Sequence, residues 1–392
     1  MPLIIQKYGG KSLATPEDVK QVAELILRRV ASGAQLVVVV SAMGDTTDRY
    51  VRMARDVNPA PAGRELDVLL SVGERISIAM LALALNGLKP DIAVSLTGAQ
   101  AGIITDTVHT AARIVEIRPL RVREILDQGR IPVIAGYQGI TTDKNISTLG
   151  RGGTDATAVG LAVALGADCV EFMKDVDGIH SADPKQIPTA KIIDKLSFEE
   201  ALEMMGCGAK IIQAPAVEMA AEHGITLAVG NSKTGVAGTI VTAKPLVRQT
   251  LTSVHVTAQV DCLTGLTAAA FYSLLDAVRD CGLSPLMSFR HEDSCAVTLK
   301  PGEAQFLSGN SCTVDRSLDL VTLIGPGVTS NNDLARAIRA LYTEYASSIV
   351  AMTATSTRIS LLMKNNQAQA FAAKAHQLCL KSPKPGAAAS PH

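Results

Sequence analysis

The segment Gln35–Ser41, which reads QLVVVVS, most constrains the fold because it holds five consecutive apolar residues, four of them β-branched valines. A strand with one face in water alternates polar and apolar residues, whereas a parallel strand covered on both faces is apolar throughout. Further short apolar runs at Leu3–Lys7, Ile92–Leu96, Ile131–Ala135 and Cys169–Met173 alternate with helical patterns. This alternation predicts an α/β/α sandwich with a mostly parallel sheet in the first part of the chain.

Two helical patterns in this part are well marked. The first begins where Thr15 can cap a helix and Pro16 fits its first turn, and we expect it to run to about Ala31. The second, Leu66–Asn86, is interrupted by a Ser-Val-Gly-Glu stretch that ends in Glu74. The interruption places one carboxylate beside a glycine.

The segment Thr148–Asp168, TLGRGGTDATAVGLAVALGAD, joins a glycine loop to a run of small apolar residues that is typical of a buried helix. Glycines let the backbone approach a ligand, and a helix N-terminus offers N–H groups to an anion. Arg151 adds a planar donor fork suited to carboxylate or phosphate, and Asp155 would face Mg²⁺ or another cation. A tight turn capped by Thr154 or Asp155 explains the same residues, so this segment alone leaves both interpretations open. The glycines of the loop are Gly150, Gly152 and Gly153.

The charge and aromatic content argue against a nucleic-acid partner. The 392-residue chain has 37 basic and 37 acidic side chains, so its net charge of +0 offers no electrostatic attraction to a polyanionic backbone. Trp is absent and aromatic residues make up 3%, which removes the stacking platforms that bind single strands.

Cysteine usage and the apolar runs bear on the compartment. Seven cysteines with no CxxC pair indicate thiols in a reducing environment rather than a disulfide frame or a zinc site. No leader is evident, and no apolar run approaches the roughly 20 residues that span a bilayer. We therefore expect a soluble, cytoplasmic protein with no membrane partner.

Past Gln249 the pattern changes to short strands and helices that repeat at a period of about 65 residues. This repeat predicts two ferredoxin-like βαβ modules, at residues 250–315 and 316–381. The strand Leu251–Val260 is expected to open the first module. The tail, 382–392, is rich in Pro and Ala, and we expect it to be flexible.

Six short motifs follow one another along the first half of the chain. They are Lys7-Tyr8-Gly9-Gly10-x-Ser12, Val40-Ser41-Ala42-Met43-x-x-Thr46-Thr47-Asp48, Leu70-Ser71-x-Gly73-Glu74, Thr148–Asp155, Asp175-Val176-Asp177-Gly178 and Gly208-Ala209-Lys210. In content and order this set closely resembles aspartate kinase. Six motifs in the right order are far more specific than any single glycine loop.

The resemblance implies the amino-acid-kinase sandwich as the catalytic domain, at residues 1–246, followed by two modules that resemble regulatory ACT domains. It implies transfer of the γ-phosphoryl group of ATP, with Mg²⁺, to the β-carboxylate of L-aspartate, giving 4-phospho-L-aspartate and ADP. This reaction opens the aspartate family pathway to lysine, threonine and methionine, or a specialised branch of it. Because ACT modules commonly pair between chains, a homodimer is expected.

A carboxylate nucleophile is ionised at neutral pH and needs no general base, so catalysis consists of positioning and charge neutralisation. The resemblance assigns these tasks to Lys7, Asp155 and Lys210, and no residue is assigned as a dedicated metal ligand. Glu74 would hold the α-ammonium group and Arg151 a carboxylate. The substrate residues are Ser41, Thr47, Glu74, Arg151 and Thr154. The nucleotide residues are Lys7, Gly9, Gly10, Ser12, Gly152, Gly153, Lys174, Asp175, His180, Lys185 and Lys210.

Several positions depart from the family pattern. Lys11 and Lys174 stand where the family has Thr, and His180 stands where it has a Tyr beside the adenine. The two extra cations would either strengthen binding of a polyanion or block the pocket by pairing with an acid such as Asp175. Lys174 is the more consequential change because it adjoins the nucleotide loop. The remaining changes are Met173 and the run Gln213-Ala214-Pro215.

The turns that form the family's effector pocket have changed as well. Thr264-Gly265 and Asn332-Asp333 stand where Pro-Gly turns are usual. The hypothesis that follows is an enzyme insensitive to lysine and threonine. Strong inhibition of initial rates by either amino acid would contradict it.

Two other functions stay open. The acceptor could be a modified aspartate or another amino acid of a secondary pathway, and Glu74 and Arg151 indicate an α-amino acid in either case. A non-catalytic amino-acid sensor could keep the same fold. Lys7, Arg151 and Asp155 argue against the sensor, because it does not need a phosphoryl-transfer set.

Overall fold

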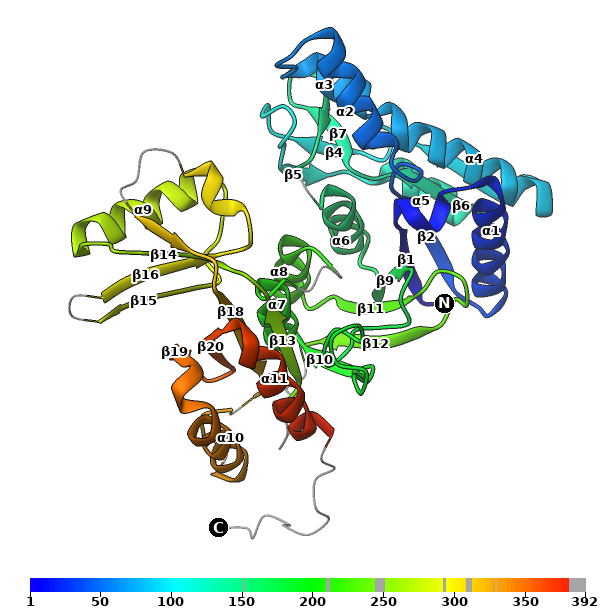
Figure 1. Ribbon diagram of the computed structural model, residues 1–392. Helices are drawn as coiled ribbons and strands as arrows, with labels where there is room; N and C mark the ends of the chain where they lie inside the picture. The colour runs from blue at the N-terminus through cyan, green and yellow to red at the C-terminus, as the bar shows by residue number, and fades with distance from the viewer. Residues whose placement is uncertain are drawn as a thin grey trace. The chain divides into compact units, whose positions relative to one another are not determined.

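The computed structural model describes residues 1–150, 152–208, 212–243, 251–291, 294–307, 312–326, 328–330 and 332–380. Two of the predicted site residues, Arg151 and Lys210, lie outside these ranges. The chain forms two compact units (Figure 1). The first comprises Met1–Ile179, Ile192–Phe198 and Lys210–Lys244, and the second comprises His180–Lys191, Glu199–Ala209 and Pro245–His392.

The first unit is built on an eight-stranded sheet of order β10-β12-β11-β9-β1-β2-β6-β3. Neighbouring strands are parallel except β11 and β12, which are antiparallel. The strands are β1 (Leu3–Tyr8), β2 (Gln35–Val40), β3 (Ala93–Leu96), β6 (Ile131–Ala135), β9 (Cys169–Lys174), β10 (Lys195–Ser197), β11 (Thr226–Asn231) and β12 (Ala237–Thr242). The predicted mostly parallel sheet is confirmed.

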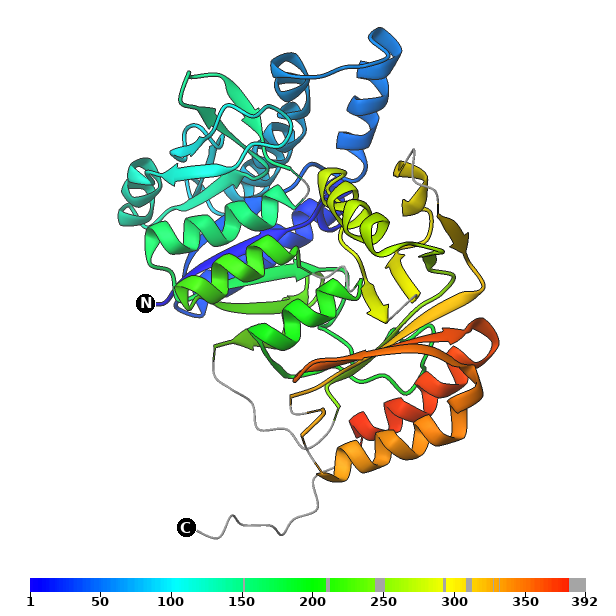
Figure 2. The ribbon, with the colours of Figure 1, turned by 90° about the vertical axis from the view of Figure 1, so that its left-hand side faces the viewer.

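Helices cover both faces of this sheet, which is why β2 is apolar from Leu36 to Val40. Leu36, Val38 and Val40 belong to a core that α1 (Pro16–Ala31) and α4 (Val72–Leu88) close. Because successive side chains alternate between faces, Val37 and Val39 point the other way, and both are fully buried. On that side α6 (Gly153–Leu165) packs against β1, β2 and β9 and against α8 (Ala214–His223) (Figure 2).

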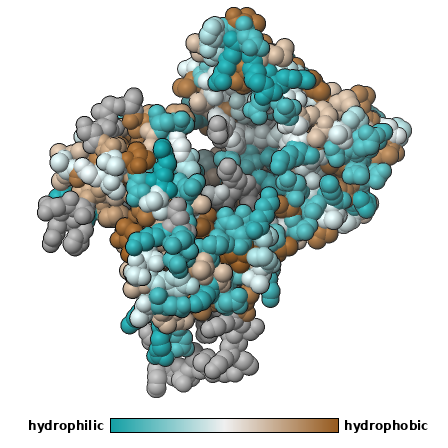
Figure 3. All heavy atoms as spheres, viewed as in Figure 1, coloured by the Kyte–Doolittle hydropathy of each residue, from teal (hydrophilic) through white to brown (hydrophobic). Residues whose placement is uncertain are grey.

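A small four-stranded sheet of order β5-β4-β7-β8 also belongs to the first unit. Its strands are β4 (Ile103–Thr105), β5 (Ile114–Ile117), β7 (Gln138–Thr141) and β8 (Ile146–Thr148). The sequence patterns did not predict this sheet, because each strand has only three or four residues. The helix α5 (Leu120–Asp127) follows β5. The helix α2 (Thr46–Val57) has no buried residue, and the surface around it, at the top of Figure 3, mixes hydrophilic and hydrophobic side chains.

The long helical pattern breaks at Ser71, as predicted, into α3 (Arg64–Leu70) and α4. Together they form one stretch, Arg64–Leu88, that is long and apolar enough by composition to cross a membrane. The expectation that no apolar stretch reaches this length was therefore wrong. Half of its most apolar window is buried inside the protein, and α4 packs against α1, as a core helix of a globular domain does.

The second unit contains two four-stranded antiparallel sheets, of order β13-β18-β20-β19 and β15-β16-β14-β17. Their strands are β13 (Ser253–Thr257), β14 (Asp261–Thr264), β15 (Met287–His291), β16 (Ser294–Leu299), β17 (Thr313–Asp315), β18 (Leu318–Ile324), β19 (Ile349–Ala354) and β20 (Arg358–Lys364). The helices are α7 (Phe198–Gly206), α9 (Ala268–Asp280), α10 (Asn332–Tyr345) and α11 (Asn365–Leu380). Small β/α modules like those expected for ACT domains are present.

The two modules are not consecutive in the chain. The strand expected to open the first module at Leu251–Val260 is β13, and it pairs with β18 of the other sheet. The first stretch, 250–315, therefore contributes one strand to the sheet formed mainly by 316–381. Strand pairing links segments about 65 residues apart, which a repeat pattern alone does not reveal.

The segment His180–Lys191 interrupts the first unit in sequence and belongs to the second unit. His376, fully buried in α11, is 2.8 Å from the Ser181 hydroxyl through Nε2 and 3.2 Å from the Thr189 hydroxyl through Nδ1. The backbone amide of Val254 in β13 donates to the carbonyl of Ser181 at 2.8 Å. His180 and Lys185, two predicted nucleotide residues, thus belong to this unit.

Candidate active site

A pocket of about 400 Å³ opens in the first unit at the carboxyl ends of its parallel strands. Lys7 lies in β1, Lys174 ends β9, and Ser41 directly follows β2. The start of α6 and the residue before α8 complete it. Ligands bind at this end of open α/β sheets. The pocket is lined by Lys7, Gly10, Ser41, Ala42, Gly44, Thr47, Glu74, Tyr137, Gly152, Gly153, Thr154, Asp155, Lys174 and Gln213.

A buried ion pair lies in this pocket. Lys7 Nζ is 2.8 Å from Asp155 Oδ1, and the two side chains are only 8% and 5% exposed. Asp155 Oδ2 accepts a hydrogen bond of 3.1 Å from the amide of Gln213. Burial by itself raises the pKa of the Asp155 carboxyl, but Lys7 and Lys174 hold that pKa below its usual range. Asp155 is therefore a carboxylate at neutral pH.

The start of α6 presents its positive end to the same pocket. Gly152 is the N-cap with φ +81°, a left-handed conformation that suits glycine, and no cap hydrogen bond from a side chain is present among the described residues. The alternative of a turn capped by Thr154 or Asp155 is therefore wrong. A Cβ on Gly153 would come within 2.4 Å of Leu149, so only glycine fits there. An uncapped N-terminus beside a lysine favours an anion.

Glu74, at the start of α4, supplies a negative group at the pocket. It is 2% exposed, its Oε1 accepts from the amide of Ala42 at 3.1 Å, and its Oε2 has no hydrogen-bond partner among the described residues. Burial raises the pKa of its carboxyl to about 7. Nearby, the Ser41 hydroxyl donates to Thr154 Oγ1 at 3.2 Å. An unsatisfied buried carboxylate oxygen is suited to an ammonium group.

The two unusual lysines have different environments. Lys174 lines the pocket, and burial, together with the charge of Lys7, lowers its pKa to about 8. Lys11 pairs instead with Asp175 at 3.3 Å, and the two side chains are 83% and 57% exposed. The pairing anticipated for an extra cation and Asp175 thus occurs at the surface, while Lys174 adds charge to the pocket itself.

Most of the predicted site residues lie together. Those that line the pocket are Lys7, Gly10, Ser41, Thr47, Glu74, Gly152, Gly153, Thr154, Asp155 and Lys174. Those that are described but do not line it are Gly9, Ser12, Asp175, His180 and Lys185. The Ser12 hydroxyl is directed to the carbonyl of Met173, at 3.5 Å, rather than toward the pocket.

Four lining residues were missed from the sequence: Ala42, Gly44, Tyr137 and Gln213. Tyr137 comes two residues after the strand Ile131–Ala135, so the rule that ligands bind at the carboxyl ends of parallel strands could have found it. Gln213 was noted only as a departure from the family. Its amide contact with Asp155 carries no signal in the sequence, because any residue except proline would supply it.

Comparison with known proteins shows to which family the chain belongs. The model of the amino acid kinase family matches residues 2–231. An aspartokinase of Mycolicibacterium smegmatis is 37% identical over 404 aligned positions, which cover 96% of this chain and 96% of the relative. The chain belongs to the amino acid kinase family and, within it, to the aspartokinases. The resemblance noted from the six motifs is confirmed.

Other aspartokinases support this placement over part or all of the chain. That of Mycobacterium tuberculosis H37Rv is 49% identical over 242 residues, 62% of this chain and 57% of the relative, less than two thirds of its length. The aspartate kinase structure from Synechocystis is 30% identical with a TM-score of 0.57, covering 98% of this chain and 70% of that one. The structure of Escherichia coli aspartokinase III with aspartate and ADP has a TM-score of 0.77 and covers 97% of this chain and 100% of that one. At 22% identity the latter shows a shared aspartokinase fold.

Proposed function

We propose that the chain transfers the γ-phosphoryl group of ATP to the β-carboxylate of L-aspartate, giving 4-phospho-L-aspartate and ADP, the first step of the aspartate family pathway. The observation that carries this proposal is the buried Lys7–Asp155 pair at the uncapped start of α6, in one pocket with the unsatisfied carboxylate of Glu74. The relatives that match are named aspartokinases, and one solved relative was crystallised with aspartate and ADP.

The phosphate end of the pocket is cationic. Lys7, Lys174 and the N-terminus of α6 converge there. Gly10 lets the backbone after β1 lie against the loop after β2, because a Cβ on it would lie 2.5 Å from the carbonyl oxygen of Ala42. During transfer, negative charge spreads over the equatorial oxygens of the phosphoryl group. Fixed cations and N–H groups stabilise that charge without reorganising at the moment of reaction. Lys7 would bridge the donor phosphates and the transferred group.

The acceptor end is built for an amino acid. Glu74 would hold the α-ammonium group, while Ser41, Thr47 and Thr154 would bind polar groups of the substrate. Arg151, outside the described residues, would clamp a carboxylate with its donor fork. The β-carboxylate is already ionised and needs only to be held in line with the phosphoryl group.

The residues of the pocket fit a magnesium ion that enters with ATP. Within the described ranges no group of three or more His, Cys, Asp or Glu side chains could hold a metal, and Asp155 is the carboxylate on the phosphate side. Mg²⁺ is commonly bound by one or two carboxylates together with substrate phosphates and water. When bound, Mg²⁺ would neutralise phosphate charge, and Asp155 is the residue that would face it.

Further parts of the proposal concern assembly and compartment. We infer a homodimer through the ACT-like modules, because the edge strand β19 exposes Val350 and Met352. A cytoplasmic location is supported by the seven cysteines, all of which are free thiols.

The test is an ADP-release assay with Mg-ATP and L-aspartate in which hydroxylamine traps the acyl phosphate. The proposal predicts a hydroxamate product, and Lys7→Met is expected to abolish turnover while amino-acid binding persists. ATP binding without turnover on aspartate would point to another amino acid as acceptor. Absence of both ATP binding and turnover would favour a sensor.

A further inference from the structure

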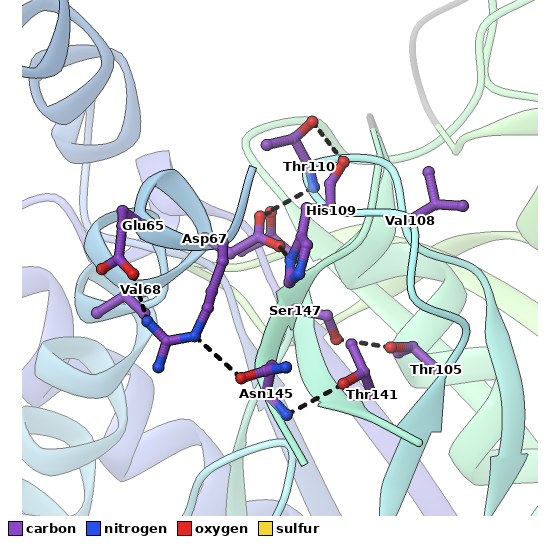
Figure 4. Close-up of polar contacts among 12 residues, drawn as sticks. Glu65, Asp67, Val68, Thr105, Val108, His109, Thr110, Thr141, Asn145 and Ser147 are labelled. Carbon is purple, nitrogen blue, oxygen red and sulfur yellow. Dashed lines mark hydrogen bonds and ion pairs between the residues drawn. The ribbon is translucent and has the colours of Figure 1, made fainter. Parts of the chain in front are cut away.

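Asp67 is a fully buried carboxylate that does not line the pocket. It lies in α3 and is 0% exposed. Its Oδ1 accepts from the amide of Thr110 at 3.0 Å and from the Thr148 hydroxyl, and its Oδ2 is 2.6 Å from His109 Nδ1. Figure 4 shows the carboxylate directed toward His109 and Thr110, beside the small sheet. These bonds satisfy the buried charge, and they join α3 to the turn at Thr110 and to β8.

The turn that Asp67 holds has a strained backbone. Thr110 has a φ of +66°, in the left-handed region, which a β-branched residue rarely adopts. Its amide is bonded to Asp67, and its hydroxyl donates to the carbonyl of His109 at 2.6 Å. Strain of this kind persists only where the surroundings enforce it, and it is typical of functional positions. The strain therefore favours a functional task for this turn.

The turn at Thr110 supports the backbone that leads into the glycine loop of the pocket. Two residues after it, the amide of Ala112 donates to the carbonyl of Thr148 at 3.0 Å, and Ala112 forms a β-bridge with Leu149. The amide of Leu149 donates to the carbonyl of Tyr137 at 2.8 Å. The side chain of Leu149 packs so closely on Gly153 that a Cβ there would come within 2.4 Å of it. The start of α6 thus rests on a segment that Asp67 and the turn hold.

The main chain of Asp67 holds the opposite end of the pocket. Its carbonyl accepts from the amide of Ser71 at 2.9 Å, and Ser71 is the junction between α3 and α4. The carbonyl of Ser71 in turn accepts from Gln138 Nε2 at 2.9 Å. Glu74 follows three residues later, in the first turn of α4. One residue therefore supports both the helix start that carries Glu74 and the strand that leads to Asp155.

We propose that Asp67 is a positioning residue for phosphoryl transfer. Through Thr148 and the turn at Thr110 its carboxylate holds the glycine loop, and through Ser71 its main chain holds Glu74. The inference rests on the proposed function, which assigns the loop to the phosphates and Glu74 to the amino acid. Transfer requires the two substrates to meet in line, and a misplacement of about 1 Å can lower the rate about 100-fold. Loss of this hold should therefore lower kcat more than it raises either KM.

The test compares Thr148→Val with a matched control, Thr141→Val. Both threonines are buried in the small sheet, but the Thr141 hydroxyl accepts from the amide of Asn145, in the turn between β7 and β8 (Figure 4). Each variant loses one buried hydrogen bond, so their melting temperatures should fall by similar amounts. Thr148→Val is expected to lower kcat about tenfold or more, with both KM values within about threefold, whereas Thr141→Val leaves kcat unchanged. Thr148→Ser, which keeps the hydroxyl, recovers most of kcat.

Hydrogen exchange measures the hold on the loop without relying on turnover. The amides of Gly153, Asp155 and Ala156 donate to carbonyls of the loop at 2.9, 2.9 and 3.1 Å. They should exchange about tenfold faster in Thr148→Val than in the wild type or in Thr141→Val. Equal changes in both variants, or a kcat of Thr148→Val within about twofold of the wild type, overturn the assignment. A wild type that binds ATP but does not turn over aspartate would refute the proposed function alone, because exchange still measures the hold.

Discussion

Replacing Lys174 with Met should stabilise the free protein and weaken its binding of ATP. Burial, aided by the charge of Lys7, lowers the pKa of Lys174 from 10.5 to about 8. Between pH 8 and 10.5 the native state therefore binds fewer protons than the unfolded chain. The resulting penalty is fully present below pH 8 and disappears as the pH rises toward 10.5. At pH 7 the displacement corresponds to a cost of about 3 kcal/mol, which an apolar side chain of similar length does not incur.

The assay is a pair of measurements on the same variant. Removing the penalty should raise the melting temperature of Lys174→Met by several degrees, at about 2–4 °C per kcal/mol for a domain of this size. Its KM for ATP should rise about tenfold or more, because one cation facing the phosphates is lost. In the wild type the KM for ATP should also rise above pH 8, as Lys174 loses its proton, and the variant should lack this dependence.

Lys11→Met is the matched control, because Lys11 is the other unusual cation but is exposed and paired with Asp175. An exposed pair contributes little, so both the melting temperature and the KM for ATP should stay close to wild type. A lower melting temperature for Lys174→Met together with an unchanged KM would refute the reasoning. Lys174 would then be a structural partner of Asp155 rather than a nucleotide ligand.

Two further predictions concern Glu74 and His376. Burial raises the pKa of Glu74 to about 7, so the KM for aspartate should rise about tenfold per pH unit below pH 7 as the carboxyl is protonated. The variant Glu74→Gln should bind aspartate weakly at every pH, with no such slope. A flat wild-type profile of this KM between pH 5 and 7 would contradict the role of Glu74. His376→Ala removes contacts with Ser181 and Thr189 and opens a buried cavity. It should lower the free energy of unfolding, measured in urea, by about 2–4 kcal/mol. The control His223→Ala, at an exposed position of α8, should leave this free energy nearly unchanged.

The parts of the fold that the sequence predicts well are those with a local cause. The run Gln35–Ser41 must be covered on both faces, and it forms the strand β2 between β1 and β6. The Thr15 cap and Pro16 start α1 where expected, and the helix ends at Ala31. The carboxyl ends of such strands then collect Lys7, Ser41 and Lys174 at one pocket, because parallel strands all end at the same edge.

The parts that the sequence does not predict depend on partners far along the chain. The pattern of β13 indicates a strand, but nothing in it selects β18 as the neighbour over a strand of the nearer module. Ser12 has the residue type of a phosphate ligand, yet the short helix Gly10–Leu13 buries its hydroxyl against Met173. Tyr137 has an ordinary sequence environment. It lines the pocket with a left-handed φ of +65°, which no local pattern predicts.

The buried charges of the pocket also explain why its two ends differ. Burial disfavours the charged forms of Glu74 and Lys174, so it raises the pKa of Glu74 and lowers the pKa of Lys174. The two side chains do not pair with each other. A folded protein that needed only stability would replace both with apolar groups. Here each buried charge matches one part of a ligand pair: Glu74 an ammonium at the acceptor end, and Lys174 a polyphosphate at the start of α6. Both groups gain a charged partner when the two substrates bind, so the features that destabilise the pocket are those that select its ligands.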